Sequence, residues 1–219
     1  MGTLYKYLSP RTLQPLTDET LRFTQPDHLK DPFECLPRTI LADTPETANA
    51  KFDRLALELN PKLEAGKVPP VREEWVADIL RRDNHSDDDL AFQLKLQKVY
   101  SSRMGILSLS ASNDSILLWS HYCDKHAGYA IGLDTEHEWF KEAVQGEFFG
   151  TVREVTYSEK RPEMIGAGER KNIDSFDFLF QKGTDWSYEE EWRFVLPLEK
   201  CEESAQGVFV RKFPRNLIP

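Results

Sequence analysis

The 219-residue chain has only three cysteines and no long apolar run. Cys35, Cys123 and Cys201 are far apart and odd in number, which favours reduced thiols over a disulfide framework. No stretch reaches the roughly 18 apolar residues of a membrane-spanning helix. The opening segment "MGTLYKYLSP" also has no basic region followed by an apolar run, so it does not resemble a secretion signal. We therefore expect a cytoplasmic protein that does not enter a membrane.

Several motifs that carry known chemistry are missing as well. The sequence has no GxGxxG and no GxxxxGK[ST], which disfavours a Rossmann domain and a P-loop enzyme. It has no GxSxG elbow, although a Ser-His-Asp triad of another kind stays open. It has no CxxC, and His121, Cys123 and His126 in "SHYCDKH" are too few ligands at the wrong spacing for zinc. We expect no metal centre there.

The net charge is −9, so the chain as a whole does not attract nucleic acid. A local basic patch is still compatible with action on nucleic acid, although a solvated helix face is the more ordinary interpretation of such a patch. The best candidate patch consists of Arg81, Arg82, Lys95, Lys98 and Arg103.

Short segments of period-two pattern alternate with helical ones, which predicts an α+β fold with small twisted, mixed or antiparallel sheets and flanking helices. We expect one domain over residues 1–219, with a helical insertion at about 45–103 where apolar residues recur at helical spacing. The expected strands are "TLYKYLS", "TLRFTQP", "GILSLSAS", "YAIGLD" and "TVREVTYS", with "EEEWRFVLPL" and "GVFVRKF" as a closing hairpin.

The remaining segments are expected to form helices or loops. "NDSILLWSHYCDKHAG" predicts a helix that Asn113 or Asp114 caps and Gly128 ends. "EHEWFKEAVQG" and "NIDSFDFLFQKG" also have helical patterns, and "RPEMIGAGERK" is expected to be a loop or lid.

The segment "TDWSYEEEWRFVLPLE" crowds three glutamates at the start of a strand. In a strand, Glu189 and Glu191 would point to one face and Glu190 to the other. Two carboxylates on one face repel, which raises a pKa and suits proton abstraction or the stabilisation of a cation. The alternative is that all three are solvated, with Arg193 as an ion-pair partner.

Two further groups of polar side chains are candidates for a site. Ser108 and Ser110 share one face of the strand "GILSLSAS", where their hydroxyls can bind a ligand, the neighbouring backbone or water. His121 and His126 lie on the following helix, where a structural role is the more common one for a single histidine.

Four stretches together resemble a bacterial family called domain of unknown function 2971. The resemblance spans roughly residues 4–196, with the helical insertion as the variable part, and it implies no established activity. The stretches are "LYKYLSPRTLQPLTDETLRFTQPDHLKDPFE", "ILSLSASNDSILLWSHYCDKHAGYAIGLD", "VTYSE" and "KGTDWSYEEEWRF".

The order of these blocks also resembles the ADP-ribosyltransferase fold. In that fold, a strand with His or Arg comes first, a Ser-x-Ser strand followed by a helix comes next, and a strand headed by Glu-x-Glu comes last. The counterparts here are Lys6, then Ser108 and Ser110, then Glu189 and Glu191. Lys6 departs from the pattern, because an ammonium meets a phosphate as a point charge and lacks the planar geometry of arginine.

This second resemblance implies cleavage of the nicotinamide–ribose bond of NAD and transfer to an unknown protein or nucleic-acid acceptor, as in a toxin or a phage-defence effector. It implies that Glu191 stabilises the oxocarbenium-like cation and that Glu189 orients or deprotonates the acceptor. Trp186 is a further candidate for stacking on a ring. The residues expected to bind NAD are Lys6, Tyr7, Ser108, Ser110, Trp119 and Tyr122.

Two other classes of function stay open. One is a non-enzymatic binding module that uses the aromatic side chains of "WSHY" and "WSYE". The other is a metal-dependent nuclease or phosphodiesterase with Mg²⁺, which requires the N-terminal loop and the late strand to meet. Its candidate residues are Asp31, Glu34, Lys182, Glu189 and Glu191.

Overall fold

The computed structural model describes residues 2–31, 33–40, 44–46, 48–49, 73–74, 76–77, 93–94, 97–142, 150–165 and 176–219. Most of the expected helical insertion at about 45–103 lies outside these residues, as do Arg81, Arg82 and Lys95 of the basic patch. The chain divides into two compact units, of which the first comprises Met1–Cys35, Gln97–Lys160 and Leu179–Pro219.

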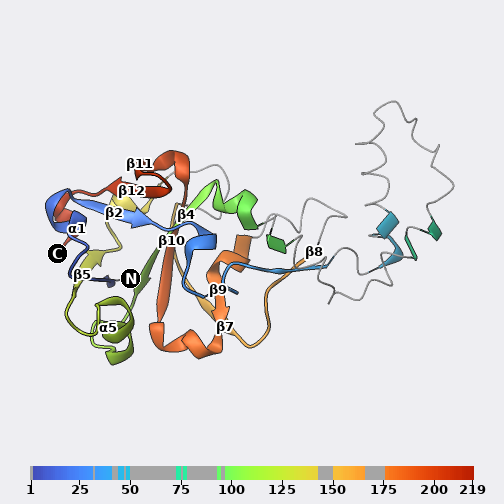
Figure 1. Cartoon of the computed structure of the whole chain (residues 1–219), viewed down its shortest axis with the longest axis horizontal. Coiled ribbons are helices and arrows are strands. Elements are labelled where there is room, and N and C mark those ends of the chain that lie inside the picture. The colour runs from blue at the N-terminus through green and yellow to red at the C-terminus, as the bar shows by residue number, and fades with distance from the viewer. Residues whose placement is uncertain are drawn as a thin grey trace. The chain divides into compact units, whose positions relative to one another are not determined.

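The first unit is built on a five-stranded antiparallel sheet with the order β5-β1-β4-β10-β6 (Figure 1). Its strands are β1 (Thr3–Leu8), β4 (Met104–Ser110), β5 (Tyr129–Asp134), β6 (Val152–Glu154) and β10 (Glu191–Pro197). Strand β4 lies between β1 and β10, so segments from the start, the middle and the end of the sequence are neighbours.

A second antiparallel sheet has the order β11-β12-β2. Its strands are β2 (Thr20–Phe23), β11 (Glu202–Ala205) and β12 (Val208–Lys212). The expected hairpin of "EEEWRFVLPL" with "GVFVRKF" is therefore wrong. Strand β11 lies between the two segments in the sequence and pairs with β12. Strand β10 pairs instead with β4 and β6.

The apolar core of this unit lies on one face of the five-stranded sheet. Phe194 contributes a ring from β10 that packs against Phe23, Trp139 and Phe140, with centroid distances of 5.8, 5.5 and 5.2 Å. Burial of such rings supplies most of the driving force for folding. The buried members of the core are Leu4, Leu8, Leu21, Phe23, Leu107, Leu109, Ile131, Leu133, Trp139, Phe140, Phe194, Leu196, Phe213 and Leu217.

The helix expected over "NDSILLWSHYCDKHAG" is shorter than predicted. Helix α5 (Ile116–Tyr122) begins after Ser115, whose side chain accepts a hydrogen bond from the backbone N–H of Leu118, so neither Asn113 nor Asp114 is the cap. After the helix, Asp124, Lys125 and His126 have positive φ angles of 48°, 57° and 69°. The left-handed turn that ends the helix is thus made by these residues rather than by Gly128.

The other elements of the first unit are short, and one of them, the 3-10 turn over Phe176–Phe180, begins in the part of the sequence that belongs to the second unit. Within the described residues, "EHEWFKEAVQG" forms a single 3-10 turn, "TVREVTYS" divides into β6 and β7, and "NIDSFDFLFQKG" forms a 3-10 turn followed by β9, which pairs with β7 in parallel. These elements are α1 (Gln14–Thr17), β7 (Thr156–Ser158), β9 (Gln181–Gly183), and the 3-10 turns η1 (Pro26–His28), η2 (Glu138–Phe140), η3 (Phe176–Phe180), η4 (Thr184–Glu189), η5 (Leu198–Lys200) and η6 (Arg215–Leu217).

The second unit comprises Leu36–Leu96 and Arg161–Phe178. Its described strands, β3 (Arg38–Ile40) and β8 (Glu163–Ile165), form a parallel pair, so part of the segment expected to be a loop or lid is a strand. The Arg161 guanidinium donates to the carbonyl of Leu36 at 2.6 Å and to Gln93 Oε1 at 3.2 Å.

The architecture confirms the mixed α+β class with antiparallel sheets and few helices. Across the described ranges, no helix is both long enough and apolar enough to cross a membrane.

We expect Gly128→Ala to destabilise the first unit. A Cβ atom at this position would lie 2.1 Å from the carbonyl oxygen of Leu8 and 2.9 Å from Cys123 Cα, and both are backbone atoms that cannot rotate away. The expected loss in the free energy of unfolding is about 1–3 kcal/mol, measured by urea denaturation. Gly2→Ala is the control, because its Cβ meets nothing within 4 Å. Equal midpoints for the two variants would contradict the close approach.

Candidate functional site

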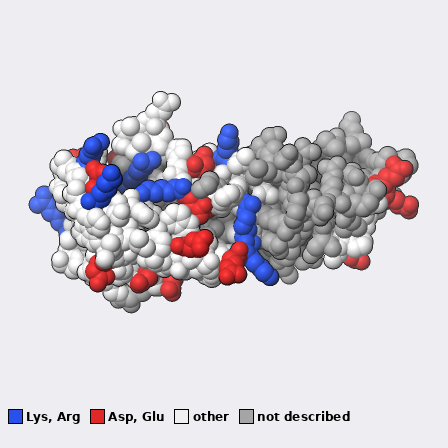
Figure 2. All heavy atoms as spheres, turned by 60° about the horizontal axis from the view of Figure 1, so that its bottom comes forward, with Lys and Arg blue, Asp and Glu red and all other residues white. Residues whose placement is uncertain are grey.

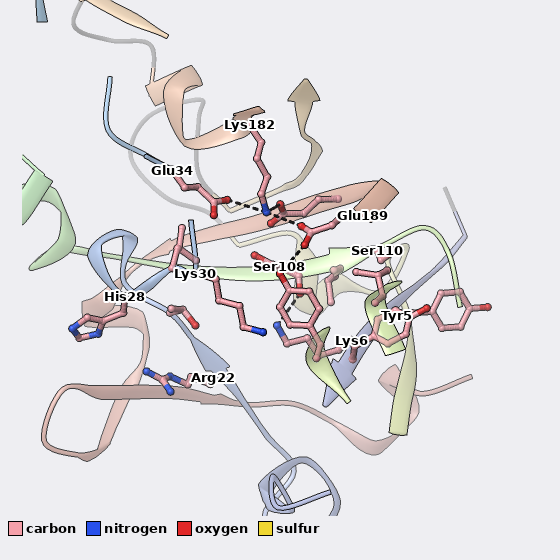
Figure 3. Close-up of a pocket in the computed structure, with 17 residues that line it drawn as sticks. Tyr5, Lys6, Arg22, His28, Lys30, Glu34, Ser108, Ser110, Lys182 and Glu189 are labelled. Carbon is pink, nitrogen blue, oxygen red and sulfur yellow. Dashed lines mark hydrogen bonds and ion pairs between the residues drawn. The ribbon is translucent and has the colours of Figure 1, made fainter. Parts of the chain in front are cut away.

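A pocket of about 260 Å³ lies in the first unit, where β1, β4 and the start of β10 meet (Figure 3). Ligand sites in proteins span about 300–1,000 Å³, so the volume of the pocket lies just below this range. Its lining residues are Tyr5, Lys6, Tyr7, Arg22, Thr24, His28, Leu29, Lys30, Glu34, Ser108, Leu109, Ser110, Leu118, Tyr122, Lys182, Glu189 and Glu191.

The register of the sheet explains why distant motifs meet here. Ser110 lies opposite Tyr5 of β1 on one side and opposite Glu191 of β10 on the other. Directly opposed residues of antiparallel strands point to the same face, so these three side chains share the face of the sheet opposite the apolar core. Ser108 follows at a spacing of two and points the same way.

Most of the side chains predicted to form the site line this pocket. Those brought together are Lys6, Tyr7, Ser108, Ser110, Tyr122, Glu189 and Glu191. Trp119 is not among the lining residues, because its ring packs edge-on against Tyr7 with a centroid distance of 5.4 Å and its indole N–H donates to the carbonyl of Asn113. The structure therefore places Trp119 behind the pocket wall rather than on it.

Lys6 lies where the pairing between strands β1 and β4 stops. Strands β1 and β4 share a single register pair, Tyr5 with Ser110, and the Lys6 ammonium donates to the carbonyl of Ser108 at 2.9 Å. Burial in the pocket wall lowers the pKa of Lys6 to about 8.

Lys182 lies at the centre of a buried cluster of carboxylates. Its Nζ atom is 2.6 Å from Glu189 Oε2, 3.0 Å from Glu191 Oε2 and 3.4 Å from Glu34 Oε1. The four residues are between 3% and 7% exposed, so water does little to separate their charges. Such a cluster holds only when each charge has a partner.

Arg193 closes this cluster into a ring of alternating charges. It is fully buried and lies two residues after Glu191 in β10, hence on the same face. Its Nε donates to Glu191 Oε1 at 2.9 Å and its Nη2 to Glu191 Oε2 at 3.0 Å, and Nη2 also contacts Glu34. Glu191 and Glu34 are therefore each held by both Lys182 and Arg193. We call Glu34, Lys182, Glu189, Glu191 and Arg193 the charge cluster.

The surroundings in the charge cluster shift the pKa values of Glu191 and Lys182. Burial raises the pKa of Glu191, although Lys182 and the Ser108 side chain oppose the shift. Burial alone would lower the pKa of Lys182, but the charges of Glu191 and Glu189 outweigh it and raise that pKa. Three carboxylates face two cations in the charge cluster, so it carries an excess negative charge beside the pocket when all are ionised.

The position of the glutamates corrects the sequence prediction in one respect. Glu189 is the last residue of η4, not a strand residue, and Glu190 has a left-handed backbone with φ 42°. This turn, rather than strand alternation, brings the side chains of Glu189 and Glu191 to the same pocket. Glu190 alone of the three is exposed, whereas Glu189 and Glu191 are 4% and 3% exposed, so the expectation of three solvated glutamates is wrong.

Tyrosines form hydrogen bonds with both predicted catalytic glutamates, one at the carboxylate of Glu189 and one at the backbone of Glu191. The Tyr122 hydroxyl donates to Glu189 Oε1 at 2.7 Å, and burial with the nearby Glu189 charge raises the pKa of Tyr122. The backbone N–H of Glu191 donates to the Tyr157 hydroxyl at 2.8 Å. The Trp186 ring lies 4.9 Å from Lys182 Nζ, which is a cation–π contact within the protein rather than a free stacking surface.

The pocket is also lined by Arg22, His28 and Lys30, which no sequence pattern had predicted as site residues. A signal for Arg22 was present, since it stands between Leu21 and Phe23 in a strand whose alternate positions are buried. Lys30 directly precedes the "DPFE" motif, of which only the carboxylates Asp31 and Glu34 were considered as candidate site residues.

Neither of the two groups of possible metal ligands forms a metal site among the described residues. Within the described ranges, no group of three or more His, Cys, Asp and Glu side chains has a geometry that could hold a metal ion. His121 is hydrogen-bonded to Tyr188 at 3.1 Å, and Asp31 accepts from the backbone of Phe33. In the charge cluster, the Lys182 ammonium stands where the carboxylates converge.

Comparison with known proteins finds a match to one family model. Residues 118–194 match the model of the family described as Protein of unknown function (DUF2971). This match supports the family expected from the motifs. The matched segment includes Tyr122, Lys182, Glu189 and Glu191, whereas Lys6 lies outside it. No curated protein and no solved structure matches the chain.

We expect Lys182→Met to destabilise the protein strongly at pH 7. Removing one partner from a buried ion-pair network leaves carboxylates uncompensated, which costs about 3–5 kcal/mol of unfolding free energy. Lys200→Met is the control, because Lys200 pairs with Glu142 with its side chain 40% exposed, and we expect a loss below about 1 kcal/mol. Urea denaturation measures both, and similar losses would contradict the role given to Lys182.

The loss in Lys182→Met should also depend on pH. Because folding raises the pKa of Glu191 above its ordinary value of 4.5, the resulting stability is complete below that value and is lost as pH rises through the folded one. Without Lys182 the folded pKa rises further, so the deficit relative to the parent chain should be smaller at pH 5 than at pH 8. A deficit that is constant with pH would contradict this account.

Proposed function

We propose that the protein is an ADP-ribosyltransferase-like enzyme that cleaves the nicotinamide–ribose bond of NAD. The observation that carries this proposal is that Glu189 and Glu191 line the same pocket as Lys6, Ser108 and Ser110. These are the residues that correspond to the three motifs of that fold. In the sheet, the Ser-x-Ser strand β4 lies between β1 and β10, so the strands that carry these motifs are neighbours.

The charges of the pocket suit the charges of NAD. NAD combines a cationic pyridinium ring with an anionic diphosphate, and the pocket combines carboxylates with Lys6. The charge cluster has an excess of negative charge that favours a positive sugar carbon, which is the electrostatic contribution expected of a glycosidic site. Given its volume of about 260 Å³, the pocket encloses part of a dinucleotide and leaves the remainder at its mouth.

The reaction proceeds by breaking the bond between C1′ of the ribose and the ring nitrogen. Both bonding electrons go to that nitrogen, so nicotinamide leaves as a neutral molecule, while Glu191 stabilises the cation that remains. A hydroxyl or amine of the acceptor, or water, then attacks C1′ and gives its proton to Glu189. The Tyr122 hydroxyl, which donates to Glu189 Oε1, and Lys182 hold that carboxylate in place for this step.

A metal-dependent phosphodiesterase remains the second candidate, because one observation favours it. The N-terminal loop and the late strand do meet, as Glu34, Glu189 and Glu191 all contact Lys182. A divalent ion would have to displace the Lys182 ammonium from the point where these carboxylates converge. Cleavage of plasmid or RNA that requires Mg²⁺ and is lost in Glu191→Gln would select this candidate over NAD cleavage.

We expect purified protein to release nicotinamide from labelled NAD and Glu191→Gln to reduce that rate by about 10²–10³-fold. This is the loss typical of removing one group that stabilises a transition-state charge. Glu190→Gln is the matched control, because Glu190 is exposed and does not line the pocket, and its rate should be unchanged.

Thermal unfolding of each variant separates a loss of catalysis from a loss of folding. The proposal fails if the parent protein neither releases nicotinamide nor transfers label to any component of a cell extract. It also fails if folded Glu191→Gln and Glu190→Gln retain the same rate.

A further inference from the structure

We propose that Lys6, Arg22 and Lys30 form a subsite for two linked phosphates. The subsite lies on the wall of the pocket opposite the charge cluster. The ligand class is thus a small molecule with a diphosphate. The proposed function supplies the identification of that molecule as a dinucleotide, whereas the subsite itself rests on the cations described below.

The three cations reach the pocket from three different elements. Lys6 belongs to β1, Arg22 to β2, and Lys30 to the segment after η1. All three line the same cavity, and Figure 3 shows the side chains of Lys6 and Lys30 pointing into it, on the side away from Lys182 and Glu34. Their convergence is a property of the fold, since the three come from separate elements.

Their charges are not neutralised by carboxylates within the described part of the chain. Lys6 donates to the carbonyl of Ser108, and Lys30 donates to the carbonyl of His121 at 2.8 Å while lying 3.8 Å from the centre of the Tyr122 ring. Arg22 is exposed and makes no ion pair with any described residue. An ammonium has three donors and a guanidinium five, so each side chain keeps donors for a ligand.

The nearest carboxylates are already engaged elsewhere. Glu189 and Glu191 hold Lys182, and Glu191 is also held by Arg193. They attract Lys6 only at longer range. Three cations without a direct counter-charge therefore share one concave surface.

Mutual repulsion among these cations favours an anion between them. The charges of Arg22 and Lys30 add to burial in lowering the pKa of Lys6. A bound anion would offset this repulsion and raise the pKa of Lys6 again. Three positive charges match the two to three negative charges of a diphosphate better than they match a single carboxylate.

The small size of the cavity favours a small phosphate ligand over a polynucleotide. A duplex does not enter a cavity of about 260 Å³, and the net charge of the chain is −9. On the face shown in Figure 2, the lysine and arginine side chains of the described residues lie among acidic ones and do not form one broad basic surface. Nucleic-acid binding generally depends on such a surface.

The opposed walls also fix the direction of the ligand. The diphosphate contacts Lys6, Arg22 and Lys30, and the electropositive part of the molecule faces Glu189 and Glu191. A ligand that entered the other way round would place like charges together at both ends, which costs free energy at each wall.

Calorimetric titration with inorganic pyrophosphate at low ionic strength tests the subsite. We expect binding that weakens with added salt, and a loss of affinity of at least about tenfold in Arg22→Gln and in Lys30→Met, because each variant removes a charge-assisted contact. Arg103→Gln is the matched control, since Arg103 is exposed and does not line the pocket. Its affinity for pyrophosphate should be unchanged.

Three results would overturn the subsite. One is the absence of pyrophosphate binding. Another is equal affinity of Arg22→Gln, Lys30→Met and Arg103→Gln. The third is tighter binding of a single-stranded oligonucleotide, increasing with its length, which would assign the cations to a polynucleotide.

The outcome is separable from that of the proposed function, because pyrophosphate binding requires no bond cleavage. Pyrophosphate binding that depends on Arg22 and Lys30, without release of nicotinamide from NAD, supports the subsite and refutes NAD cleavage. NAD cleavage with KM unchanged in Arg22→Gln and Lys30→Met supports the enzyme and refutes the subsite.

Discussion

The arrangement of the site depends on the burial of two cations, Lys182 and Arg193, among three carboxylates. Charges removed from water are costly unless each one is paired at close range, so Lys182 and Arg193 fix where Glu34, Glu189 and Glu191 must lie. Replacing such a network with apolar residues of similar volume is often neutral or stabilising in other proteins. Stability alone is therefore a weak reason for this network, and its position on the wall of a pocket supports a chemical use.

The topology of the sheet is what makes this network possible. Because β4 lies between β1 and β10, one short strand presents Ser108 and Ser110 to both the N-terminal strand and the strand of Glu191. The face toward the core carries Phe194 and Leu196 from the same strand that carries Glu191 and Arg193 on the other face. A single period-two pattern in β10 thus builds the apolar core and the charge cluster together.

Much of the site could be predicted from local sequence patterns. The alternation in "GILSLSAS" predicted that the side chains of Ser108 and Ser110 lie on the same face of a strand. The order of the motif blocks predicted that Lys6 and Glu191 lie in one site. The α+β class followed from the same patterns. The ADP-ribosyltransferase-like nature of the fold stays a prediction.

Other features depend on contacts that no local pattern encodes. The left-handed backbone of Glu190 is uncommon for a residue other than glycine, so a continuous strand was the natural expectation for the three glutamates. The hairpin of β10 with β12 was wrong because neighbouring strands in sequence were assumed to pair, whereas β11 supplied the partner. Arg22 and Lys30 were not predicted because the packing of β2 and η1 against β4, rather than a local pattern, brings their side chains to the same pocket.

The stacking of Lys30 on Tyr122 physically connects the two walls of the pocket. The same tyrosine whose ring lies 3.8 Å from the Lys30 ammonium donates its hydroxyl proton to Glu189 at 2.7 Å. Any movement of the ammonium alters the electric field at that ring and at the O–H group that binds the carboxylate. Tyr122 therefore joins the proposed phosphate subsite to Glu189 through a single side chain, so that a ligand contacting Lys30 would also change the surroundings of Glu189.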